Sequence, residues 1–411
     1  PAFDRTKCPN CSSLVDLSAA RKVRGDRLMV DKTAFVLRPP RRWEVAVFHC
    51  PTDADKPYVK RVVGLPGEHV RLSDGDAYAN GDLLRKTLAQ VRETRVPVFD
   101  MEFAPPGGWG VRWVVEPSPT APKLPTAAPR LPETTADEAH LRDGVLTLDG
   151  TAGGPVGLTY RNWHLDERKE VPVGVGLAYN GGSRRAEFAA DAAPVAHDFC
   201  VAFDLEVTAG EGAFAVRLGD GGDHVRAELP VGGGSPTLAH EGGSPPSAGA
   251  GPGLSVGKTY RVEFALVDRR ASLAVDGAEV VPPLDLKADP PGPSGRVGVT
   301  RPVLLEARGV AASVRGFRLF RDIHYDAPKA AKAAGWRMPA DEFFVVGDNA
   351  DNSKDSRGWA ADDVPKPGVP ERAFIGKPFL IHQPMRLARV PAGGPGWAVQ
   401  TVDWDRLRLL R

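Results

Sequence analysis

Glycine and proline fill about a fifth of this 411-residue chain, with 45 and 39 copies, and this abundance restricts the fold more than any other feature. An average chain contains about 12% of the two together. Each glycine costs a helix interior about 1 kcal/mol and each proline about 3 kcal/mol, so a long helical bundle is excluded. A hydrophobic fraction of 42% argues against disorder. The composition therefore predicts a mostly β globular protein, rich in turns, with two or three domains.

The charge balance excludes one large class of function. Lysine and arginine number 53 against 52 acidic residues, which gives a net charge of +1. A globally basic nucleic-acid-binding protein is therefore not expected, and nucleic acid is not among the predicted partners. No apolar run is long enough to span a bilayer, and the chain begins with Pro1 rather than methionine. We expect a piece of a longer protein, with any membrane anchor upstream of it.

Four stretches of the chain differ in texture. Residues 1–112 carry short β-branched and aromatic runs between glycines and prolines, which is typical of strands. Prolines crowd into 113–140, which predicts a semi-rigid linker. Alternating segments and Asp-Gly turn pairs in 141–325 predict a β-sandwich, and strand-like runs return in 326–411. We predict one domain built from the first and last stretches and one domain inserted within it.

Two segments carry the chemistry. Lys60 lies in the apolar run Tyr58–Val63, and a lysine facing an apolar core loses hydration, so its pKa falls and its neutral amine can act as a base. The polar segment Gly347–Arg357 is dense in Asp, Ser and Arg and can form a hydrogen-bond network that orients such a base. Taken singly, each segment has an ordinary explanation, because strand lysines usually point outward and polar loops are usually solvated.

Together the two segments resemble type I signal peptidases, the Ser/Lys proteases that remove signal peptides outside the cytoplasmic membrane. Two smaller segments match the same family, and the resemblance covers residues 1 to about 110 and 326 to about 390. The four segments, in chain order, are Gly25–Lys32, Arg42–Phe48, Tyr58–Glu68 and Gly347–Arg357. The resemblance implies a mostly β fold, a discontinuous signal-peptidase-like domain. Gly295–Tyr325 resembles the last strands of a concanavalin-like jelly roll, which would be the inserted sandwich.

The resemblance also implies a role for each matching residue. Lys60 would be the general base of a Ser/Lys dyad, and Ser353 would orient its amine. Arg61 would pair with Asp348, and Asp355 would form a structural ion pair with Arg357. The implied residues of the substrate-binding edge and pocket are Leu28, Tyr58 and Val59.

The nucleophile is the main departure from the family pattern. The family motif reads Ser-Met-x-Pro-Thr, and no Ser-Met pair occurs in this sequence. Pro1-Ala2 suits the end of that motif, so we expect the nucleophilic serine upstream of Pro1. Ser18 is the alternative within the chain, although Ala19 follows it where methionine is expected. Ala350 is a second departure, because the family commonly has a basic residue there.

These observations imply a signal peptidase I-like serine endopeptidase at the cytoplasmic membrane, with its catalytic domain on the extracytoplasmic side. Its partners would be preproteins that bear signal peptides, and it would need no cofactor. The chain itself would be inactive without the upstream serine. The alternative is a non-catalytic protein whose sandwich binds glycan or peptide on a protease scaffold. Trp163, Trp336 and Trp359 would then be stacking or core residues.

The Cys8-Pro9-Asn10-Cys11 segment leaves several readings open. Its spacing is half of a zinc ribbon, and tetrahedral zinc needs four ligands. A redox pair, a local disulfide loop or the remnant of a knuckle fits the same four residues. We predict no metal site here, and keep Cys8 and Cys11 as the zinc ligands if one exists.

Overall fold

The fold is described from a computed structural model of the chain. Its placement is described for residues 5–16, 26–51, 53–105, 108–109, 112–116, 140–152, 154–175, 194–243, 245–292, 294–328, 334–350, 353–359, 367–381, 385–389, 398–402 and 408–409. Residues 117–139 of the predicted linker lie outside this set, and so does Ser18.

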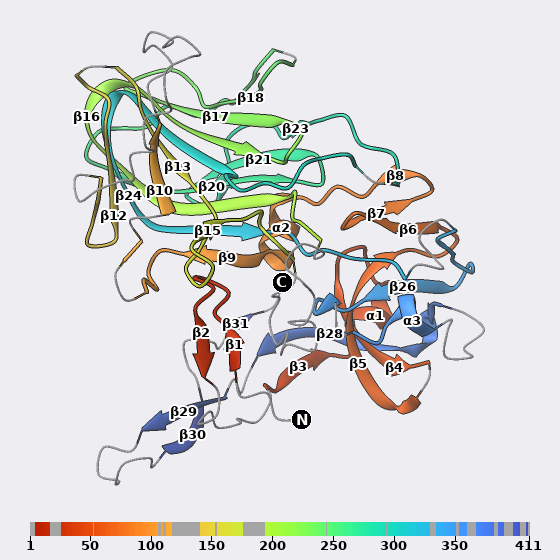
Figure 1. Ribbon diagram of the computed structural model, residues 1–411. Helices are drawn as coiled ribbons and strands as arrows, with labels where there is room; N and C mark the ends of the chain where they lie inside the picture. Colours follow the sequence, from red (N-terminus) through yellow and green to blue (C-terminus); the bar gives the residue numbers. More distant parts are fainter. Residues whose placement is uncertain are drawn as a thin grey trace. The chain divides into compact units, whose positions relative to one another are not determined.

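Contacts divide the chain into two compact units (Figure 1). Unit 1 comprises residues 1–5, 16–82 and 325–411, and unit 2 comprises 6–15 and 83–324. The mostly β fold, with a sandwich interrupting a discontinuous domain, is thereby confirmed. The contacts assign the chain from Leu83 onward to unit 2, ahead of the predicted linker at 113–140 and sandwich at 141–325, because the segment after Leu83 pairs with sandwich strands.

Unit 1 is built from short strands. Its elements are β3 (Leu28–Asp31), α1 (Ala34–Leu37), β4 (Val45–Cys50), β5 (Asp53–Gly64), β6 (His69–Ser73), β7 (Asp76–Ala79), β8 (Asp82–Leu83), β25 (Trp336–Arg337), β26 (Glu342–Val346), α3 (Ser356–Trp359), β27 (Val369–Pro370), a 3₁₀ turn at Glu371–Ala373, β28 (Phe374–Ile381), β29 (Met385–Arg389), β30 (Ala398–Val402) and β31 (Arg408–Leu409). One sheet has the order β27-β26-β5-β4-β28-β3, and a smaller one has the order β25-β6-β7-β8.

The larger sheet joins the two distant parts of the sequence. β26 pairs antiparallel with β5, and β28 pairs antiparallel with β4. Residues at every second position of β4, namely Ala46, Phe48 and Cys50, face one core. The ring centroid of Phe48 lies 6.1 Å from that of Trp359. Burial of this alternating face therefore fixes β5, and with it Lys60, in register with Ala46 of β4.

Unit 2 holds the longest strands. Its elements are β1 (Arg5–Lys7), β2 (Leu14–Asp16), α2 (Leu88–Thr94), β9 (Val96–Asp100), β10 (Trp113–Glu116), β11 (Leu141–Arg142), β12 (Val145–Asp149), β13 (Val156–Tyr160), β14 (Trp163–His164), β15 (Lys169–Glu170), β16 (Phe199–Gly219), β17 (His224–Val231), β18 (Thr237–His240), β19 (Ser247–Ala248), β20 (Thr259–Val267), β21 (Arg270–Val275), β22 (Ala278–Glu279), β23 (Leu284–Asp285) and β24 (Val303–Arg321). β1 and β2 form a hairpin of their own.

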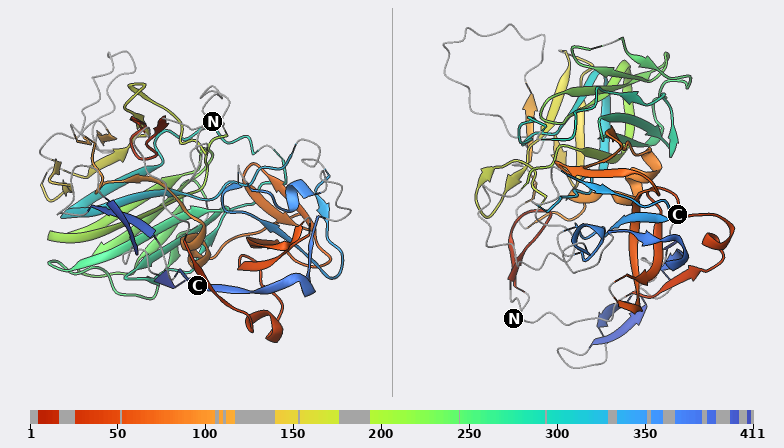
Figure 2. Two further views of the ribbon diagram at one scale, coloured as in Figure 1. Left: turned by 90° about the horizontal axis from the view of Figure 1, so that it is seen from below. Right: turned by 90° about the vertical axis from the view of Figure 1, so that its right-hand side faces the viewer.

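The sandwich is organised around β16 and β24, which lie side by side along most of their length (Figure 2). The first half of β16 also pairs with β20, and its second half pairs with β17. Residues from both halves meet in one core, where the rings of Phe203 and Phe214 lie 6.1 Å apart. Cys200 and Ala202 point to the opposite face, where they pack with Leu88 and Val91 of α2. β16 is one long strand, and its pairing with β24 has three register shifts.

Several predicted turns are present. The Asp276-Gly277 pair joins β21 to β22 with φ angles of 51° and 85°, as a type I′ hairpin requires. Asp143-Gly144 joins β11 to β12 in the same way. These turns set the strand register where the side chains alone do not.

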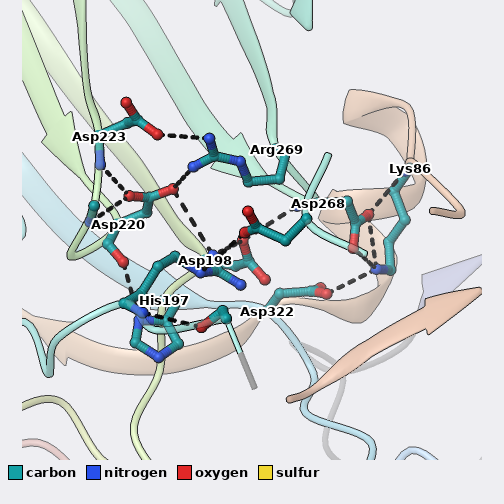
Figure 3. A network of polar contacts seen from close by, with 12 residues as sticks. Lys86, His197, Asp198, Asp220, Asp223, Asp268, Arg269 and Asp322 are labelled. Carbon is teal, nitrogen blue, oxygen red and sulfur yellow. Dashed lines mark hydrogen bonds and ion pairs between the residues drawn. The ribbon is translucent and has the colours of Figure 1, made fainter. Parts of the chain in front are cut away.

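A buried charge network lies beside the points where the chain enters and leaves the insert (Figure 3). The Lys86 ammonium lies 2.9 Å from Asp268 and 2.8 Å from Asp322, and all three side chains are buried. Asp198 accepts the backbone amide of Asp268 at 3.2 Å. Arg269 joins Asp220 to Asp223 a little farther along the same network. The network therefore ties the entry segment, the exit segment and the β20–β21 turn together.

Candidate active site

The structure brings Lys60 and Ser353 together although 293 positions separate them in sequence. Lys60 lies on β5, and its Nζ donates a hydrogen bond of 2.8 Å to Ser353 Oγ. Ser353 follows β26, the strand that pairs with β5. The amine also lies 5.4 Å from the centroid of the Tyr58 ring on the same strand. A hydroxyl at this distance can orient a lysine amine, which is the arrangement that a lysine base needs.

Burial sets the protonation of this amine. Loss of hydration lowers the pKa of Lys60 below its ordinary value of 10.5. The Asp355 carboxylate acts in the opposite direction, and the Arg357 guanidinium acts in the same direction as burial. A half-buried lysine with a lowered pKa has a larger neutral fraction at moderate pH than a surface lysine.

Gly347 makes room for the hydrogen bond between Lys60 and Ser353. A Cβ at this position would collide with the Cβ and Oγ of Ser353 and would lie 3.1 Å from Lys60 Nζ. Any side chain at Gly347 would thus displace one partner of the bond. In the sequence, Gly347 stands directly after the apolar strand β26 and begins the polar segment, but this position alone does not show which atoms lie beside it.

Asp355 and Arg357 form a buried ion pair next to Gly347. Arg357 Nε and Nη2 donate to the two carboxylate oxygens of Asp355 at 2.9 and 2.7 Å. Asp355 is fully buried and also accepts the Gly347 amide at 2.9 Å. Burial alone raises the pKa of Asp355, but the bonds from Arg357 outweigh it and hold that pKa below its usual value. The carboxylate therefore stays ionised and fixes both Gly347 and the loop that follows.

Arg61 and Asp348 form a second pair with bidentate geometry. Arg61 Nε and Nη2 donate to Asp348 at 3.0 and 2.9 Å, and its Nη1 donates to the Trp43 carbonyl at 2.7 Å. Arg61 is buried, whereas the Asp348 side chain is 41% exposed. The pair joins β5, which carries Lys60, to the residue after Gly347 at the end of β26.

The residues expected to bind substrate lie at strand edges of unit 1. β26 pairs with β5 only from Arg61 to Gly64, so in the described part of the chain Tyr58 and Val59 pair with β4 alone. Val59 is 42% exposed and Leu28 is 36% exposed. Leu28 lies on β3, which is the last strand in the order of the larger sheet and pairs with β28. A shared pocket of Leu28 and Val59 stays a prediction.

The cysteine segment forms a turn in unit 2. The four cysteines of the chain are free thiols, so the disulfide loop is not formed. Among the described residues, neither Cys8 nor Cys11 belongs to a group of three possible metal ligands. His164, Asp166 and Glu167 form such a group, but the ammonium of Lys7 lies 2.7 Å from Asp166 and neutralises it.

The tryptophans named for glycan stacking are mainly core residues. Trp359 is fully buried, and Trp336 is buried against Phe344. Both belong to unit 1 rather than to the sandwich. Trp163 is half-buried, with the Arg161 guanidinium 4.6 Å from its ring centroid. None of the helices in the described ranges is long and apolar enough to cross a membrane.

Comparison with known proteins gives one family. Residues 17–118 and 307–382 match the model for signal peptidase, peptidase S26. A probable signal peptidase I-2 from Synechocystis sp. is 46% identical over 65 residues, which are 14% of this chain and 29% of that protein. A signal peptidase I from Leptolyngbya laminosa is 40% identical over 73 residues, which are 16% of this chain and 36% of that protein. The chain thus aligns with about a third of the length of these relatives.

Solved structures match this chain only loosely. A carbohydrate-binding module from Bacillus subtilis is 13% identical and has a TM-score of 0.25, covering 43% of this chain and 94% of that chain. A family 7 alginate lyase is 13% identical with a TM-score of 0.27, covering 44% and 82%. Similarity at this level indicates nothing about the ligand or activity of this chain.

The family match and the site geometry concern the same residues. The first matched segment contains Lys60 and Arg61, and the second contains Asp348, Ser353 and the Asp355–Arg357 pair. Both parts of unit 1 therefore match the type I signal peptidase family, and the sequence between the two matched segments belongs to a β-sandwich.

Proposed function

We propose that the chain supplies the catalytic domain of a membrane-bound serine endopeptidase that removes signal peptides from exported preproteins. The observation that carries the proposal is the half-buried Lys60 amine, 2.8 Å from Ser353 Oγ and with a lowered pKa. The Arg61–Asp348 and Asp355–Arg357 ion pairs support it, because they hold the residues around Lys60 and Ser353 in place. The usual location of the family supports a domain on the extracytoplasmic side of the cytoplasmic membrane.

The reaction is acyl transfer by a Ser/Lys dyad. No Ser-Met pair occurs in the sequence, so the nucleophilic serine is proposed to lie upstream of Pro1. Its Oγ attacks the scissile carbonyl carbon while its proton passes to the neutral Lys60 amine. The resulting lysinium gives that proton to the leaving amine as the C–N bond breaks. Water then adds to the acyl-enzyme carbonyl carbon as Lys60 takes one of its protons, and Lys60 returns that proton to the serine Oγ as the ester C–O bond breaks. The chain without that serine would be inactive.

Substrate recognition uses the open side of β5. An extended preprotein segment would add its backbone hydrogen bonds beside Tyr58 and Val59. The exposed side chains of Val59 and Leu28 would accept small apolar residues next to the cleavage site. Ser353 binds no substrate in this scheme and only holds the Lys60 amine in place.

The test is cleavage of a precursor peptide by the protein extended upstream of Pro1 through its own reading frame. Lys60→Met keeps the apolar stem but removes the amine, so kcat/KM should fall by at least about 10³-fold. Lys56→Ala is the matched control, because Lys56 lies on the same strand and is exposed. The control should keep kcat/KM within about twofold, since a single exposed surface substitution rarely matters more.

Two results would overturn the proposal. Full cleavage by a folded Lys60→Met protein would remove the base from the mechanism. Cleavage by the chain beginning at Pro1, at the rate of the extended protein, would remove the upstream nucleophile. In that second case Ser18 becomes the residue to replace with alanine.

A further inference from the structure

Two thiols that the protease chemistry does not use lie in one turn. Cys8 and Cys11 are three positions apart in the connection between β1 and β2, within the segment 6–15 of unit 2. The Ser12 amide donates to the Cys8 carbonyl at 2.8 Å, and the Cys8 amide donates to the Ser13 carbonyl at 2.9 Å. Ser12 has a φ of 64°, so one left-handed residue closes the turn. The backbone between the two thiols is therefore held in a closed loop.

The closed turn has dimensions that suit a disulfide. A turn of four residues brings its first and fourth Cα atoms within about 7 Å of each other. A disulfide joins Cα atoms that are usually about 4.4–6.8 Å apart. The structure has Cys8 and Cys11 as free thiols, which is the reduced form of such a pair. A bond can therefore form by rotation of the two side chains, without a change in the path of the backbone.

Asn10 fixes this turn to the sandwich from a position between the two thiols. Its Nδ2 donates to the carbonyls of Asp100 and Phe103 at 3.0 and 3.2 Å, and its Oδ1 accepts the Asp100 amide at 2.8 Å. The Cys11 carbonyl also accepts the Leu165 amide at 3.3 Å. None of these bonds uses a sulfur atom, so they hold the turn whatever the state of the cysteines. A turn held in this way keeps one thiol at a high effective concentration beside the other.

The two thiols differ in exposure, and this difference gives them different roles. Cys11 is 8% exposed and packs in the main sandwich core, whereas Cys8 is only partly buried against that core. A dissolved disulfide therefore reaches Cys8 first, and Cys11 is placed to attack the mixed disulfide from within the turn. Cys200, in the same unit, is 1% exposed. Burial raises the pKa of the Cys200 thiol to about 11, so that this thiol stays protonated at neutral pH.

We propose that Cys8 and Cys11 form a reversible disulfide by exchange with a low-molecular-weight disulfide of the glutathione type. The Cys8 thiolate attacks one sulfur of the reagent, the S–S bond of the reagent breaks, and its other half leaves as a thiolate. The Cys11 thiolate then attacks the Cys8 sulfur and expels the second half. The pair loses two electrons and two protons, and the reagent gains them as two thiols. All of these residues belong to unit 2, so the inference does not depend on the proposed function.

This disulfide would be a modification rather than a structural support. Its ring encloses only the residues Cys8–Cys11, so it removes less entropy from the unfolded chain than a bridge across a long loop does. The bonds of Asn10 already hold the turn in the reduced form. We therefore expect the fold of unit 2 to be the same in both redox states, and the bond to be readily reversed.

Titration of the chain in glutathione buffers tests the exchange. After denaturation in acid and alkylation with N-ethylmaleimide, trypsin releases both thiols in one peptide, Cys8–Arg21. The bridged peptide lacks two hydrogens and carries no alkyl group. Its share should rise in one transition, with a tenfold change in the ratio of disulfide to dithiol for each change of about 30 mV, as a two-electron couple requires. Cys200 should carry no glutathione at any buffer ratio, because it is buried.

Three variants test the roles of the residues in the turn. Cys11→Ser should stop at a mixed disulfide, with one glutathione on Cys8. Cys8→Ser leaves only the buried thiol of Cys11, which should take up glutathione at least about tenfold more slowly. Asn10→Ala should lower the equilibrium constant for the disulfide about tenfold, because the turn loses bonds that preorganise it. Cys200→Ala is the matched control and should leave the transition in place.

Several results would overturn the inference. A peptide that carries two glutathiones, or none, at every buffer ratio would show that the thiols cannot meet in the folded turn. A bridged peptide that appears only when Cys200 also takes up glutathione would come from unfolded chain. If one equivalent of zinc protected both thiols from N-ethylmaleimide and blocked their oxidation, the segment would be a metal site instead. The assay reads masses and needs no cleavage activity, so failure of the proposed function would leave its result unaffected.

Discussion

At the scale of single residues, the site depends on a glycine as much as on the side chains that form its hydrogen bonds. Gly347 has no side chain, and that absence lets Ser353 Oγ approach Lys60 Nζ to 2.8 Å. The sequence predicted Lys60, Ser353 and their supporting pairs through a family pattern. It could not predict the Gly347 contact, because which atoms a Cβ would strike depends on the fold of two segments that are far apart in sequence.

Gly347→Ala tests this steric requirement. The added methyl would force Ser353 or the Lys60 amine aside, so we expect kcat/KM of the extended protein to fall about 10²-fold. Gly358→Ala is the control, since a Cβ there meets nothing within 4 Å. Cleavage by Gly347→Ala at the normal rate would show that the close packing around Ser353 is not needed for catalysis.

The pH dependence tests the state of the Lys60 amine. The base must be neutral, so kcat/KM should rise with pH along a limb that lies below 10.5. Asp348 is a negative charge that raises the pKa of Lys60, so Asp348→Asn should lower that pKa and move the limb to lower pH. Asp341→Asn, at an exposed carboxylate of unit 1, should leave the limb in place. A shift to higher pH would contradict the stated sign.

At the scale of elements, the local sequence pattern predicted the strands better than the turns that connect them. β-branched runs marked β4, β5 and β26, and Asp-Gly pairs marked the hairpin turns. The β20–β21 turn carries no such signal, because Asp268 and Arg269 adopt φ angles of 49° and 59° that usually favour asparagine and glycine. Ion pairs with Lys86 and Asp220 hold both residues there. Such tertiary compensation cannot be read from a turn's own sequence.

Lys86→Met tests that compensation. Burial alone would lower the pKa of Lys86, but Asp268 and Asp322 outweigh it and raise that pKa, so the ammonium is charged in the folded protein. Removing it leaves two buried carboxylates without their shared partner, which typically costs about 3–5 kcal/mol. Urea unfolding of the chain should show a loss of this size. Lys258→Met, at the surface beside Tyr260, should change stability by less than about 0.5 kcal/mol, and equal losses in both variants would refute the role of the network.

At the scale of the whole molecule, the insertion enters and leaves the chain through one charged cluster. Lys86 follows the entry at Leu83, and Asp322 precedes the exit at His324. The sequence predicted an inserted sandwich from its texture, but it placed the first boundary at 113 because the strands on either side of Leu83 look alike. Only the pairing of β9 and β10 with β24 and β13 assigns 83–116 to the insert.

The last prediction concerns how this cluster makes the stability of the chain depend on pH. Asp198 is 15% exposed and lies near Asp268, Asp322 and Lys86, and the Arg296 guanidinium is 3.9 Å away. Burial, together with the neighbouring carboxylates, raises its pKa from 3.8 to about 7. Between these two values the folded protein holds a proton that the unfolded chain has released. Each unit of pKa difference is worth about 1.4 kcal/mol, so stability should fall by a few kcal/mol as the pH rises through this window.

Asp198→Asn removes the proton exchange but keeps the shape of the side chain and one acceptor for the Asp268 amide. Urea unfolding at pH 5 and pH 8 should therefore give this variant a smaller loss on going to pH 8 than the unchanged chain. At pH 8 the variant should be the more stable of the two, because it avoids a buried charge that the native carboxylate must carry. Asp166→Asn serves as the control, since Asp166 lies in the same unit and is paired with Lys7. If Asp198→Asn were the less stable protein at pH 8, the carboxylate would be stabilised by its surroundings, and the sign derived from its raised pKa would be wrong.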